Sequence, residues 1–473
     1  MNERPNLSKM TSDEKDALIG ALLAHIEKQD GRIKELERRL GLNSGNSGKP
    51  PSSDGYRKKP NPQNLREKTG KKSGGQEGNE GKNLRQVEHP DKIIDHCPSA
   101  CRGCGGALGL EDATEHRKRQ VFDIPKPQPI EVTEHRAHCC RCAHCGTRTD
   151  ASFPEDIAAA TQYGANIAAL VVYLQAWHFV PEDRLAELMH DVFGVDLSTA
   201  TIAAMAQRKA DQWNDLANHI GEQVKQAGVK HMDETGLRIA GILQWLHVAS
   251  TALLTFYRTS SKRGAMMENV IGIIVHDFWR PYFTIEGVLH ALCNAHHLRE
   301  LKNLVEIEKE PWALAMSRFL RQACHATNLA RRRQEPLKQA FLDWLSMRYD
   351  RIVEQGLALH DGMPSLETMP RKRRGKPRRR AGHNLLLRLQ GHKEDTLRFL
   401  TNPDVPFTNN QAERDSRMMK LRQKISGCFR TETGARTFAT LRTVLSTARK
   451  QGWNILDTIA QRPSILAQNL RVA

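Results

Sequence analysis

Two pairs of cysteines constrain the fold of the first third of this chain more tightly than any other feature. Cys101 and Cys104, and then Cys142 and Cys145, are each separated by two residues and followed by glycine. Such a spacing lets both sulfurs of a pair face one cation, and four thiolates complete a closed tetrahedral zinc site. We therefore predict a structural Zn²⁺ in a zinc ribbon, with a hairpin between the two pairs at residues 121–138.

The choice of zinc ligands stays open, because other donors lie close to the two pairs. Cys139 and Cys142 form a second frame with the same spacing, and further candidates surround it: Cys97, His138, Cys140 and His144. Seven of the ten cysteines fall between Cys97 and Cys145. In an intracellular chain this clustering favours metal over disulfides, and the competing interpretation is a set of free thiols.

The segment 12–40 predicts a helix with an apolar seam. Four aliphatic residues recur at every seventh position, and three more residues fill the second seam position: Ile19, Ile26, Ile33 and Leu40, with Leu22, Gln29 and Leu36. This pattern is typical of a coiled coil, so we expect residues 1–42 to associate with a second copy. The alternative is an amphipathic helix that lies on its own domain.

Residues 43–88 are rich in Gly, Pro, Ser and Lys and contain few apolar side chains. Such a segment buries too little apolar surface to offset the entropy that it would lose on ordering. We expect a flexible basic linker here.

Residues 156–220 predict a wholly helical segment. Within it, a helix at 183–193 is followed by Gly194 and by a second helix that Ser198 caps. Two helices joined by a glycine turn are typical of a helix-turn-helix, which places its second helix in the major groove of DNA. An ordinary helical hairpin within a core fits the same residues.

Past residue 228 the pattern changes from helix to strand. The residues predict three short antiparallel strands, a helix and a further strand, at 229–239, 244–251, 253–260, 264–270 and 273–279. This order is the opening of a ribonuclease-H-like α/β fold. Further helices are expected in an insertion at 303–400, from about 403 to 424, and at 434–451.

These patterns predict a multidomain chain whose α/β ribonuclease-H-like core contains a helical insertion. The expected units, in chain order, are a coiled-coil helix (1–42), a flexible basic linker (43–88), a zinc ribbon (89–152), an all-α DNA-binding segment (153–225), the first segment of the core (226–302), a helical basic insertion (303–400) and the second segment of the core (401–473).

Three acidic residues are candidates for a catalytic metal site. Asp233 lies inside a strand-like run, where aspartate is depleted because it competes with the ladder and is costly to bury. Asp277 ends an apolar run, and α/β sheets place chemistry at the carboxyl ends of strands. Glu413 lies in the first turn of a helix. If the three converge, two Mg²⁺ (or Mn²⁺) ions about 3.5–4 Å apart would relieve their repulsion and support an in-line displacement at phosphorus.

Each acid also has a structural interpretation. Asn410 and Glu413 have the spacing of a capping box, in which the glutamate accepts a hydrogen bond from the backbone of the cap. Asp233 can sit at a turn beside Glu234, and Asp277 can cap the segment that follows it. Separation in sequence does not by itself establish that the three residues meet.

The charge of the chain favours a polyanionic partner. Lys and Arg number 71 against 54 Asp and Glu, a net charge of +17. Neutralised phosphates release counterions, so the surplus favours a polyanion, and a basic protein that binds none is the alternative. Together with the zinc module and the helix-turn-helix pattern, it leads us to expect double-stranded DNA as the partner. Eight of the ten residues at 371–380 are basic, and those expected to bind DNA are Arg371, Lys372, Arg373, Arg374, Arg378, Arg379 and Arg380. No apolar run reaches about 18 residues and no secretory leader is visible, so we expect a cytoplasmic protein without a membrane partner.

Several motifs in combination resemble the insertion-sequence-66-type transposases, a DDE family with a ribonuclease-H-like core. The resemblance covers nearly the whole chain, and its motifs include NSGNSGKPPSSDG (43–55), the paired CxxCG knuckles, HMDETGLRI (231–239), VHDFWRPYF (275–283), HALCNAHHLREL (290–301) and TNNQAERDSRMMKLRQKISGCFRT (408–431). It implies that Asp233, Asp277 and Glu413 are the three catalytic acids.

The resemblance also implies an activity. An enzyme of this kind binds the terminal inverted repeats of a mobile element and hydrolyses a phosphodiester at each end to free a 3′-hydroxyl. It then uses that hydroxyl to attack target DNA, without a covalent protein–DNA intermediate. We expect a homo-oligomer on DNA in the bacterial nucleoid, and accessory proteins from the same element are candidate partners.

Two further groups lie near the acids. Arg414 and Arg417 share the helix of Glu413 and are expected to contact phosphate, with a Glu413–Arg417 ion pair as the alternative. A C-x-x-H-H run at 293–297 follows the second acid. For this run we favour packing and DNA contact over a second metal site.

Three other functions fit some of the sequence features. A zinc-ribbon DNA-binding regulator explains the charge and the cysteines but leaves the acids without a role. A recombinase with a covalent tyrosine needs one near the C-terminus, whereas the last tyrosine is Tyr349. A ribonuclease-H-like host nuclease would cut without strand transfer. Flanking inverted repeats with a short target duplication distinguish a transposase from such a nuclease.

Overall fold

The computed structural model describes residues 10–43, 45–46, 86–114, 117–123, 130–264, 267–363 and 379–472. Most of the expected linker (43–88) lies outside these ranges, as do Arg371, Lys372, Arg373, Arg374 and Arg378 of the basic block. All three candidate acids and all four candidate zinc ligands lie inside them.

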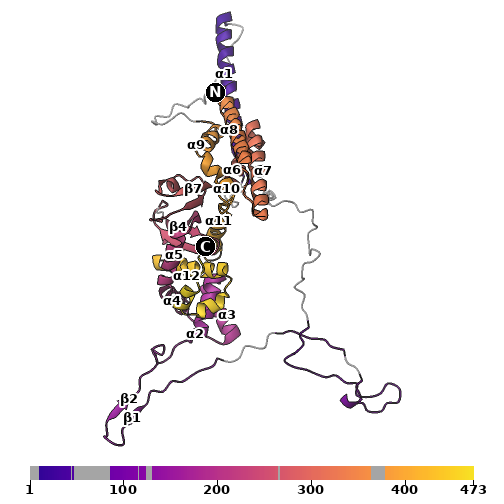
Figure 1. The fold of residues 1–473 in the computed structure, drawn as a ribbon, viewed down its shortest axis with the longest axis vertical. Coiled ribbons are helices and arrows are strands. Elements are labelled where there is room, and N and C mark those ends of the chain that lie inside the picture. Colours follow the sequence, from indigo (N-terminus) through magenta and orange to yellow (C-terminus); the bar gives the residue numbers. More distant parts are fainter. Residues whose placement is uncertain are drawn as a thin grey trace.

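The N-terminal helix α1 runs from Ser12 to Gly41 and projects from the rest of the molecule (Figure 1). A capping box begins it, because Glu14 Oε2 accepts the amide of Thr11 at 2.9 Å and the Thr11 hydroxyl accepts the amide of Glu14 at 3.4 Å. The apolar seam is exposed, from 49% at Leu36 to 69% at Leu40. The helix therefore does not lie along its own domain, which removes that alternative; the coiled coil stays a prediction.

A mixed five-stranded sheet, in the order β5-β4-β3-β6-β7, forms the centre of the molecule. Its strands are β3 (Val229–Ile239), β4 (Ile242–Ser250), β5 (Thr255–Ser260), β6 (Ile273–His276) and β7 (Leu289–Leu292). The first three strands form an antiparallel meander, whereas β6 pairs in parallel with β3, and β7 with β6. Ala240 and Gly241 turn β3 into β4 with φ values of 49° and 81°, as a tight hairpin requires.

Helices cover both faces of this sheet. Over one face lies α11 (Asn410–Ser426), whose Met419 shares a core with Leu237 of β3. On the other face α5 (Asn214–Gln226) packs its apolar side with Met232. Because side chains alternate along a strand, odd-numbered residues of β3 face α11 and even-numbered residues face the α5 side.

The outer edge of β5 is covered by α12 (Glu432–Gln451). The amides of Thr255 and Tyr257 donate to the hydroxyls of Thr447 and Thr443, each at 3.0 Å. Two residues of a strand advance by about 6 Å, and four residues of a helix advance by about the same distance. The spacing of the two threonines along α12 therefore equals the spacing of the two β5 amides that point away from β4. An edge that would otherwise present free backbone groups is thereby satisfied.

Helices also precede the sheet. They are α2 (Ala165–Val172), a π-turn η4 (Tyr173–Trp177), α3 (Glu182–Phe193), α4 (Thr199–Gln212) and α5. Gly194 ends α3 with φ 65°, and the Ser198 hydroxyl caps α4 by accepting the amide of Thr201 at 3.0 Å. The helix–glycine–helix arrangement expected from the sequence is therefore present; DNA contact by α4 stays a prediction.

The expectation that residues 156–164 are helical was wrong. The Gln162 side chain accepts the amide of Ala158 at 3.1 Å and donates to the carbonyl of Asp156 at 2.6 Å. These local bonds hold a turn in place of helical hydrogen bonds. The first helix of the segment begins only after Gly164.

Most of the described residues between β7 and α11 are helical. The elements are α6 (Asn294–Asn303), a π-turn η6 (Leu304–Glu308), α7 (Pro311–Arg333), α8 (Gln339–Asp361), α9 (Ala381–Gly391) and α10 (Lys393–Thr401). Their shared core includes Phe319 and Tyr349 and continues into the sheet at Val275. Arg398 of α10 donates from Nε to the carbonyl of His290 at 2.6 Å, which covers the β7 edge.

Two further expectations were wrong in detail, and one strand was missed. The helix expected at 264–270 is absent from its described residues, because Asn269 has φ 57° and a reversal there lets Met267 and Val270 both reach the core. The strand expected at 273–279 ends at His276. Strand β7 was not predicted, since four residues are too few to show alternation.

The chain ends in two short helices, α13 (Ile455–Ala460) and α14 (Pro463–Gln468), which pack into the core beside α12 and α5. Among the described helices, none combines the length and apolarity needed to cross a membrane.

Gly272 offers a test of how β6 is positioned beside β3. Its φ is +80°, and a Cβ there would lie 2.5 Å from the carbonyl oxygen of Gly228. Gly241 has φ +81° with nothing within 4 Å of such a Cβ. A left-handed residue costs about 1–2 kcal/mol, so Gly241→Ala should lose about that amount and Gly272→Ala considerably more. Urea unfolding of the two variants measures the difference, and equal losses would contradict the close approach.

Candidate active site and zinc-binding module

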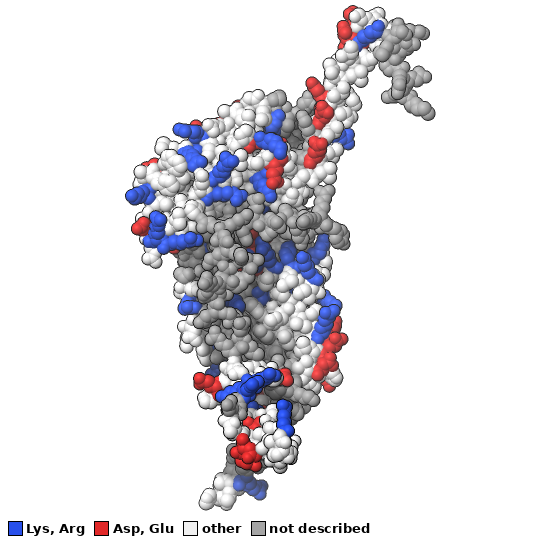
Figure 2. All heavy atoms as spheres, turned by 90° about the vertical axis from the view of Figure 1, so that its right-hand side faces the viewer, with Lys and Arg blue, Asp and Glu red and all other residues white. Residues whose placement is uncertain are grey.

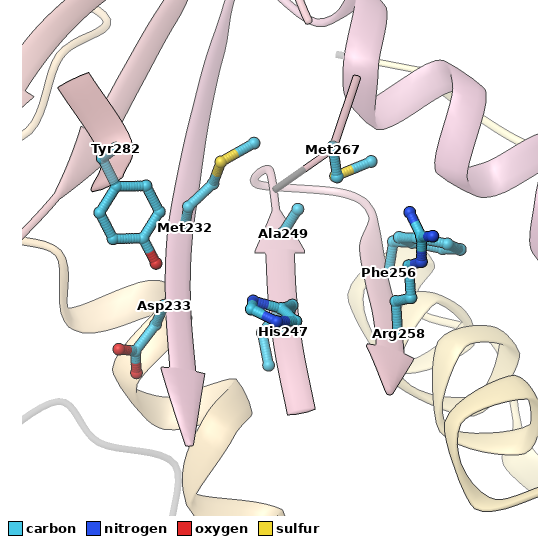
Figure 3. Close-up of a pocket in the computed structure, with 9 residues that line it drawn as sticks. Met232, Asp233, His247, Ala249, Phe256, Arg258, Met267 and Tyr282 are labelled. Atoms are coloured by element: carbon cyan, nitrogen blue, oxygen red, sulfur yellow. The ribbon is translucent and has the colours of Figure 1, made fainter. Parts of the chain in front are cut away.

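Asp233 lies in the middle strand of the sheet, opposite Val248 of β4. Its Oδ2 accepts a hydrogen bond from the Ser416 hydroxyl of α11 at 2.7 Å. In Figure 3 its carboxylate and the side chain of Met232 leave β3 on opposite sides. Burial, with smaller contributions from neighbouring acids, raises the pKa of Asp233 to about 7. The turn position considered for Asp233 is wrong, because both Asp233 and Glu234 lie within the strand.

Asp277 follows the last residue of β6, the parallel neighbour of β3. Its Oδ1 accepts the amide of Trp279 at 3.1 Å, so it also closes a turn that starts the next segment. Burial, and then the charge of Glu234, raises the pKa of Asp277, while the amide of Trp279 acts in the opposite direction. The structural interpretation of Asp277 is therefore partly correct and does not exclude a role as a ligand.

Glu413 lies in the first turn of α11, and the capping box that was its alternative interpretation does not form. The cap of α11 is Asn409, one residue earlier than predicted, and its amide donates to Cys293 Sγ at 3.1 Å. The Glu413 carboxylate is only 17% exposed, and its Oε1 is buried without a hydrogen-bond partner. A buried carboxylate oxygen in this condition calls for a ligand, and a cation is one candidate.

The three acids face a common region. Ser416 brings Asp233 close to the turn that carries Glu413, because its hydroxyl lies 2.7 Å from Asp233 Oδ2 and 3.0 Å from the Glu413 carbonyl oxygen. Asp277 follows the strand beside that of Asp233, and the charges of Asp277 and Glu413 both raise the pKa of Asp233. Their oxygens do not, however, form a group with every pair within 4.8 Å. Carboxylate oxygens are the ligands that Mg²⁺ and Mn²⁺ prefer, so the donor set fits such ions. The side chains must therefore move towards one another before they can bind the same cation.

Asn409 connects the elements that carry the acids, a role that sequence reasoning missed. Its side chain is 2% exposed, accepts from His231 Nδ1 at 2.9 Å and donates to the carbonyl of Met232 at 2.7 Å. Ser416 was missed as well, although its position three residues after Glu413 places both on one side of the helix. That spacing is the sequence feature that could have identified it.

A second network lies on the even-numbered side of β3. Glu234, whose side chain is 3% exposed, pairs with Arg263 at 2.9 Å and accepts the Tyr282 hydroxyl at 2.5 Å. The Arg263 guanidinium lies 4.7 Å from the Trp245 ring and 4.0 Å from the Trp279 ring. This network was not predicted, and it ties the segments after β5 and β6 to the strand of Asp233.

The basic residues expected near the site are exposed. Arg417 is 68% exposed and lies 3.7 Å from Glu413. The Glu413–Arg417 ion pair, which was the alternative to a phosphate contact, is therefore longer than a hydrogen bond. Arg414 donates to Gln411 at 2.9 Å on the surface of α11. Arg379 is exposed and Arg380 half-buried. On the face drawn in Figure 2, Lys and Arg are spread over several places rather than gathered in one patch.

The two cysteine pairs form two turns of the same kind. The amide of Cys101 donates to Gly106 and that of Cys142 to Thr147, each at 2.8 Å. Gly105 and Gly146, which follow the pairs, have φ values of 75° and 72°. These turns prepare the sulfurs to bind a cation, because backbone amides of Cys104 and Gly103 lower the pKa of Cys101, and Thr147 lowers that of Cys145.

The two pairs are not assembled into one site in this structure, since no group of close metal donors includes them among the described residues. The hairpin expected at 121–138 is absent from its described stretches, where Val121 and Val132 are 92% and 86% exposed and nothing packs on them. Strands β1 (Cys139–Arg141) and β2 (Arg148–Asp150) instead flank the second pair, apart from the larger sheet (Figure 1). The donors fit zinc, which would draw the pairs together.

Comparisons with known proteins match three regions of the chain. Residues 160–437 match the model described as "Transposase IS66 family", and residues 98–146 match a zinc-finger binding domain of transposase IS66. Residues 2–85 match a family of unknown function. An uncharacterized protein, y4hP, of Sinorhizobium fredii is 23% identical over 428 residues, which are 80% of this chain and 72% of that protein.

The pKa of Asp233 predicts how the stability of the protein without metal ions depends on pH. The folded-state pKa of about 7 exceeds the usual value of about 3.9. Below pH 4 both states are protonated, and the penalty for burying the charge grows between pH 4 and 7, to at most about 4 kcal/mol. Asp233→Asn should therefore raise the melting temperature in EDTA at pH 8 but not at pH 4. The control is Asp211→Asn, at an exposed acid; a pH-independent gain at Asp233 would contradict the assignment.

Proposed function

The chain belongs to the Transposase IS66 family, and from that premise we propose that it is a DDE transposase with Asp233, Asp277 and Glu413 as its catalytic acids. The observation that carries the proposal is their placement on the middle strand, after its parallel neighbour, and on the helix across that face. The meander followed by two parallel strands supports a ribonuclease-H-like core. The zinc-finger match supports a structural Zn²⁺ and DNA as the partner.

Divalent cations held by the acids would activate the attacking oxygen and stabilise the leaving oxygen. The chain's own residues position these ligands. Ser416 orients Asp233, the amide of Trp279 orients Asp277, and Asn409 fixes the start of the helix that carries Glu413. Preorganisation of this kind matters because an error of about 1 Å in the reacting geometry can cost about 100-fold in rate.

The reaction proceeds in two steps. Water adds to phosphorus at the end of the element, and the bond to the 3′-oxygen breaks, which frees a 3′-hydroxyl. That hydroxyl then adds to a phosphorus of target DNA while the target's own 3′-oxygen leaves. The first step turns one phosphodiester into a 5′-phosphate and a 3′-hydroxyl, with a proton from the water passing to the leaving 3′-oxygen. The second step exchanges one phosphodiester for another, and neither step needs a covalent link to the protein.

DNA recognition is proposed for several parts of the chain. They are the zinc module at 98–146, helix α4 with Arg208 on its exposed side, Arg414 and Arg417 beside the acids, and the basic block at 371–380. We also propose that α1 pairs with α1 of a second copy, because its seam is exposed over its whole length. Accessory proteins from the same element stay an expectation.

Substitution of any one acid should abolish cleavage. Asp233→Asn, Asp277→Asn and Glu413→Gln keep the shape of each side chain but remove a cation ligand, so the rate should fall by at least about 100-fold. Cleavage of a labelled inverted-repeat end in Mg²⁺ measures this, with binding of the same DNA as a check on folding. Exposed Glu286→Gln is the control. Normal cleavage by Glu413→Gln would remove Glu413 from the site.

The basic block should account for part of the salt dependence of DNA binding. Replacing the Arg and Lys residues of 371–380 by Gln should reduce the slope of log K against log salt by about 0.9 for each phosphate that the block no longer neutralises. Fluorescence anisotropy at several salt concentrations gives the slope. An unchanged slope would mean that the block faces away from DNA.

The seam of α1 should control oligomerisation. Ile26→Asp places a charge in the seam, where it should dissociate the paired helices and shift the protein towards monomer in analytical ultracentrifugation. Lys28→Asp, off the seam, should leave the association unchanged. A wild-type protein that is monomeric at all concentrations would contradict the coiled coil.

A further inference from the structure

A second group of metal donors lies beside the acids. Cys293 Sγ, a ring nitrogen of His296 and a carboxylate oxygen of Glu413 lie within 4.8 Å of one another, and no other such group occurs among the described residues. Ligands around a tetrahedral zinc ion stand about 3.5 Å apart, given bonds of about 2.0–2.3 Å. Small rotations of these side chains would therefore bring all three onto one ion.

Two of the three donors have an atom without a hydrogen-bond partner, and these two atoms face each other. His296 Nδ1 and Glu413 Oε1 are buried, have no hydrogen-bond partner, and lie 3.8 Å apart. This separation is too long for a hydrogen bond, so neither atom compensates the other. Arg299 also stands 3.8 Å from Glu413 Oε1, but its side chain is 32% exposed and can turn towards solvent when a cation takes its place.

The third donor sits in a setting suited to a thiolate. Cys293 occupies the cap position of α6, and its Sγ accepts the backbone amide of Asn409 at 3.1 Å. This bond favours a negative sulfur, whereas burial favours the neutral thiol. A bound cation would supply the missing positive charge and release the proton.

We propose that Cys293, His296 and Glu413 form a Zn²⁺ site with one open position. Sulfur, imidazole and a single carboxylate suit Zn²⁺, whereas Mg²⁺ prefers oxygen ligands alone. The sequence alone favoured packing for the C-x-x-H-H run; the unpaired atoms of His296 and Glu413 favour a metal site instead. His297 belongs to the packing, since it is 1% exposed and bonded to Asn294 at 3.1 Å.

The site has a consequence that rests on the proposed function. Glu413 is also the proposed third catalytic acid, so a Zn²⁺ ion here withdraws it from the Mg²⁺ ligands. Zinc should therefore inhibit cleavage by competition for one side chain, at a site separate from the structural zinc of the 98–146 module.

Metal binding is tested with the full-length chain in which all seven cysteines of the zinc module are replaced by Ser: Cys97, Cys101, Cys104, Cys139, Cys140, Cys142 and Cys145. After Co²⁺ is added, this protein should bind one equivalent with a thiolate-to-cobalt absorption band. The band should disappear in Cys293→Ser and persist in Cys324→Ser, a half-buried cysteine outside the group. No band, or a band that survives Cys293→Ser, would overturn the site. Glu413→Gln, which keeps the thiol, should weaken Co²⁺ binding even if Cys293→Ser fails to fold.

The consequence is tested by the ratio of cleavage rates with and without added Zn²⁺ in Mg²⁺. The ratio should fall well below one in the wild type and return towards one in Cys293→Ser. Because each ratio compares a variant with itself, its basal rate does not matter. An equal ratio in both proteins would overturn the competition. Absence of cleavage in every protein would count against the proposed function, while the cobalt result still decides the site.

Discussion

The buried side chain of Asn409 is the interaction on which the geometry of the site depends. It holds the start of α11 against β3 through His231 and Met232, and the backbone amide of the same residue donates to Cys293 Sγ at the start of α6. Three segments that are far apart in sequence thus meet at one residue. A buried amide with its hydrogen bonds satisfied is rigid, because any displacement leaves unpaired groups in a dry environment. Glu413 takes its place relative to Asp233 from this contact.

Burial gives the acids their properties. Asp233 and Asp277 lie on or beside strands of the sheet interior, where desolvation is the largest cause of their raised pKa values. Burial makes the charged form of such a carboxylate unfavourable, and a bound cation would offset that cost. The same residues therefore lower the stability of the protein without metal ions and are suited to binding a catalytic cation. The site therefore combines a rigid frame with charges that the protein alone does not neutralise.

Much of this arrangement could be predicted from the sequence, and the failures have physical causes. The long strands β3 and β4 and helices α1 and α12 were predicted because their patterns extend over many residues. Strand β7 and the reversal at Asn269 are short, and tertiary packing decides them. The cap of α11 was misplaced by one residue because Asn409 and Asn410 are both good caps in isolation; the partners of Asn409, 178 and 116 residues away, decide between them.

The covered edges of the sheet restrict how copies of the chain can join. The threonines of α12 occupy the outward amides of β5, and Arg398 occupies a carbonyl of β7. Neither edge is open to a strand from another molecule, so two copies of the chain cannot merge their sheets into one. In the proposed transposase, copies would join through helices and through DNA, and such an assembly would separate when the DNA leaves. A core that is closed to permanent association would suit the release of the product.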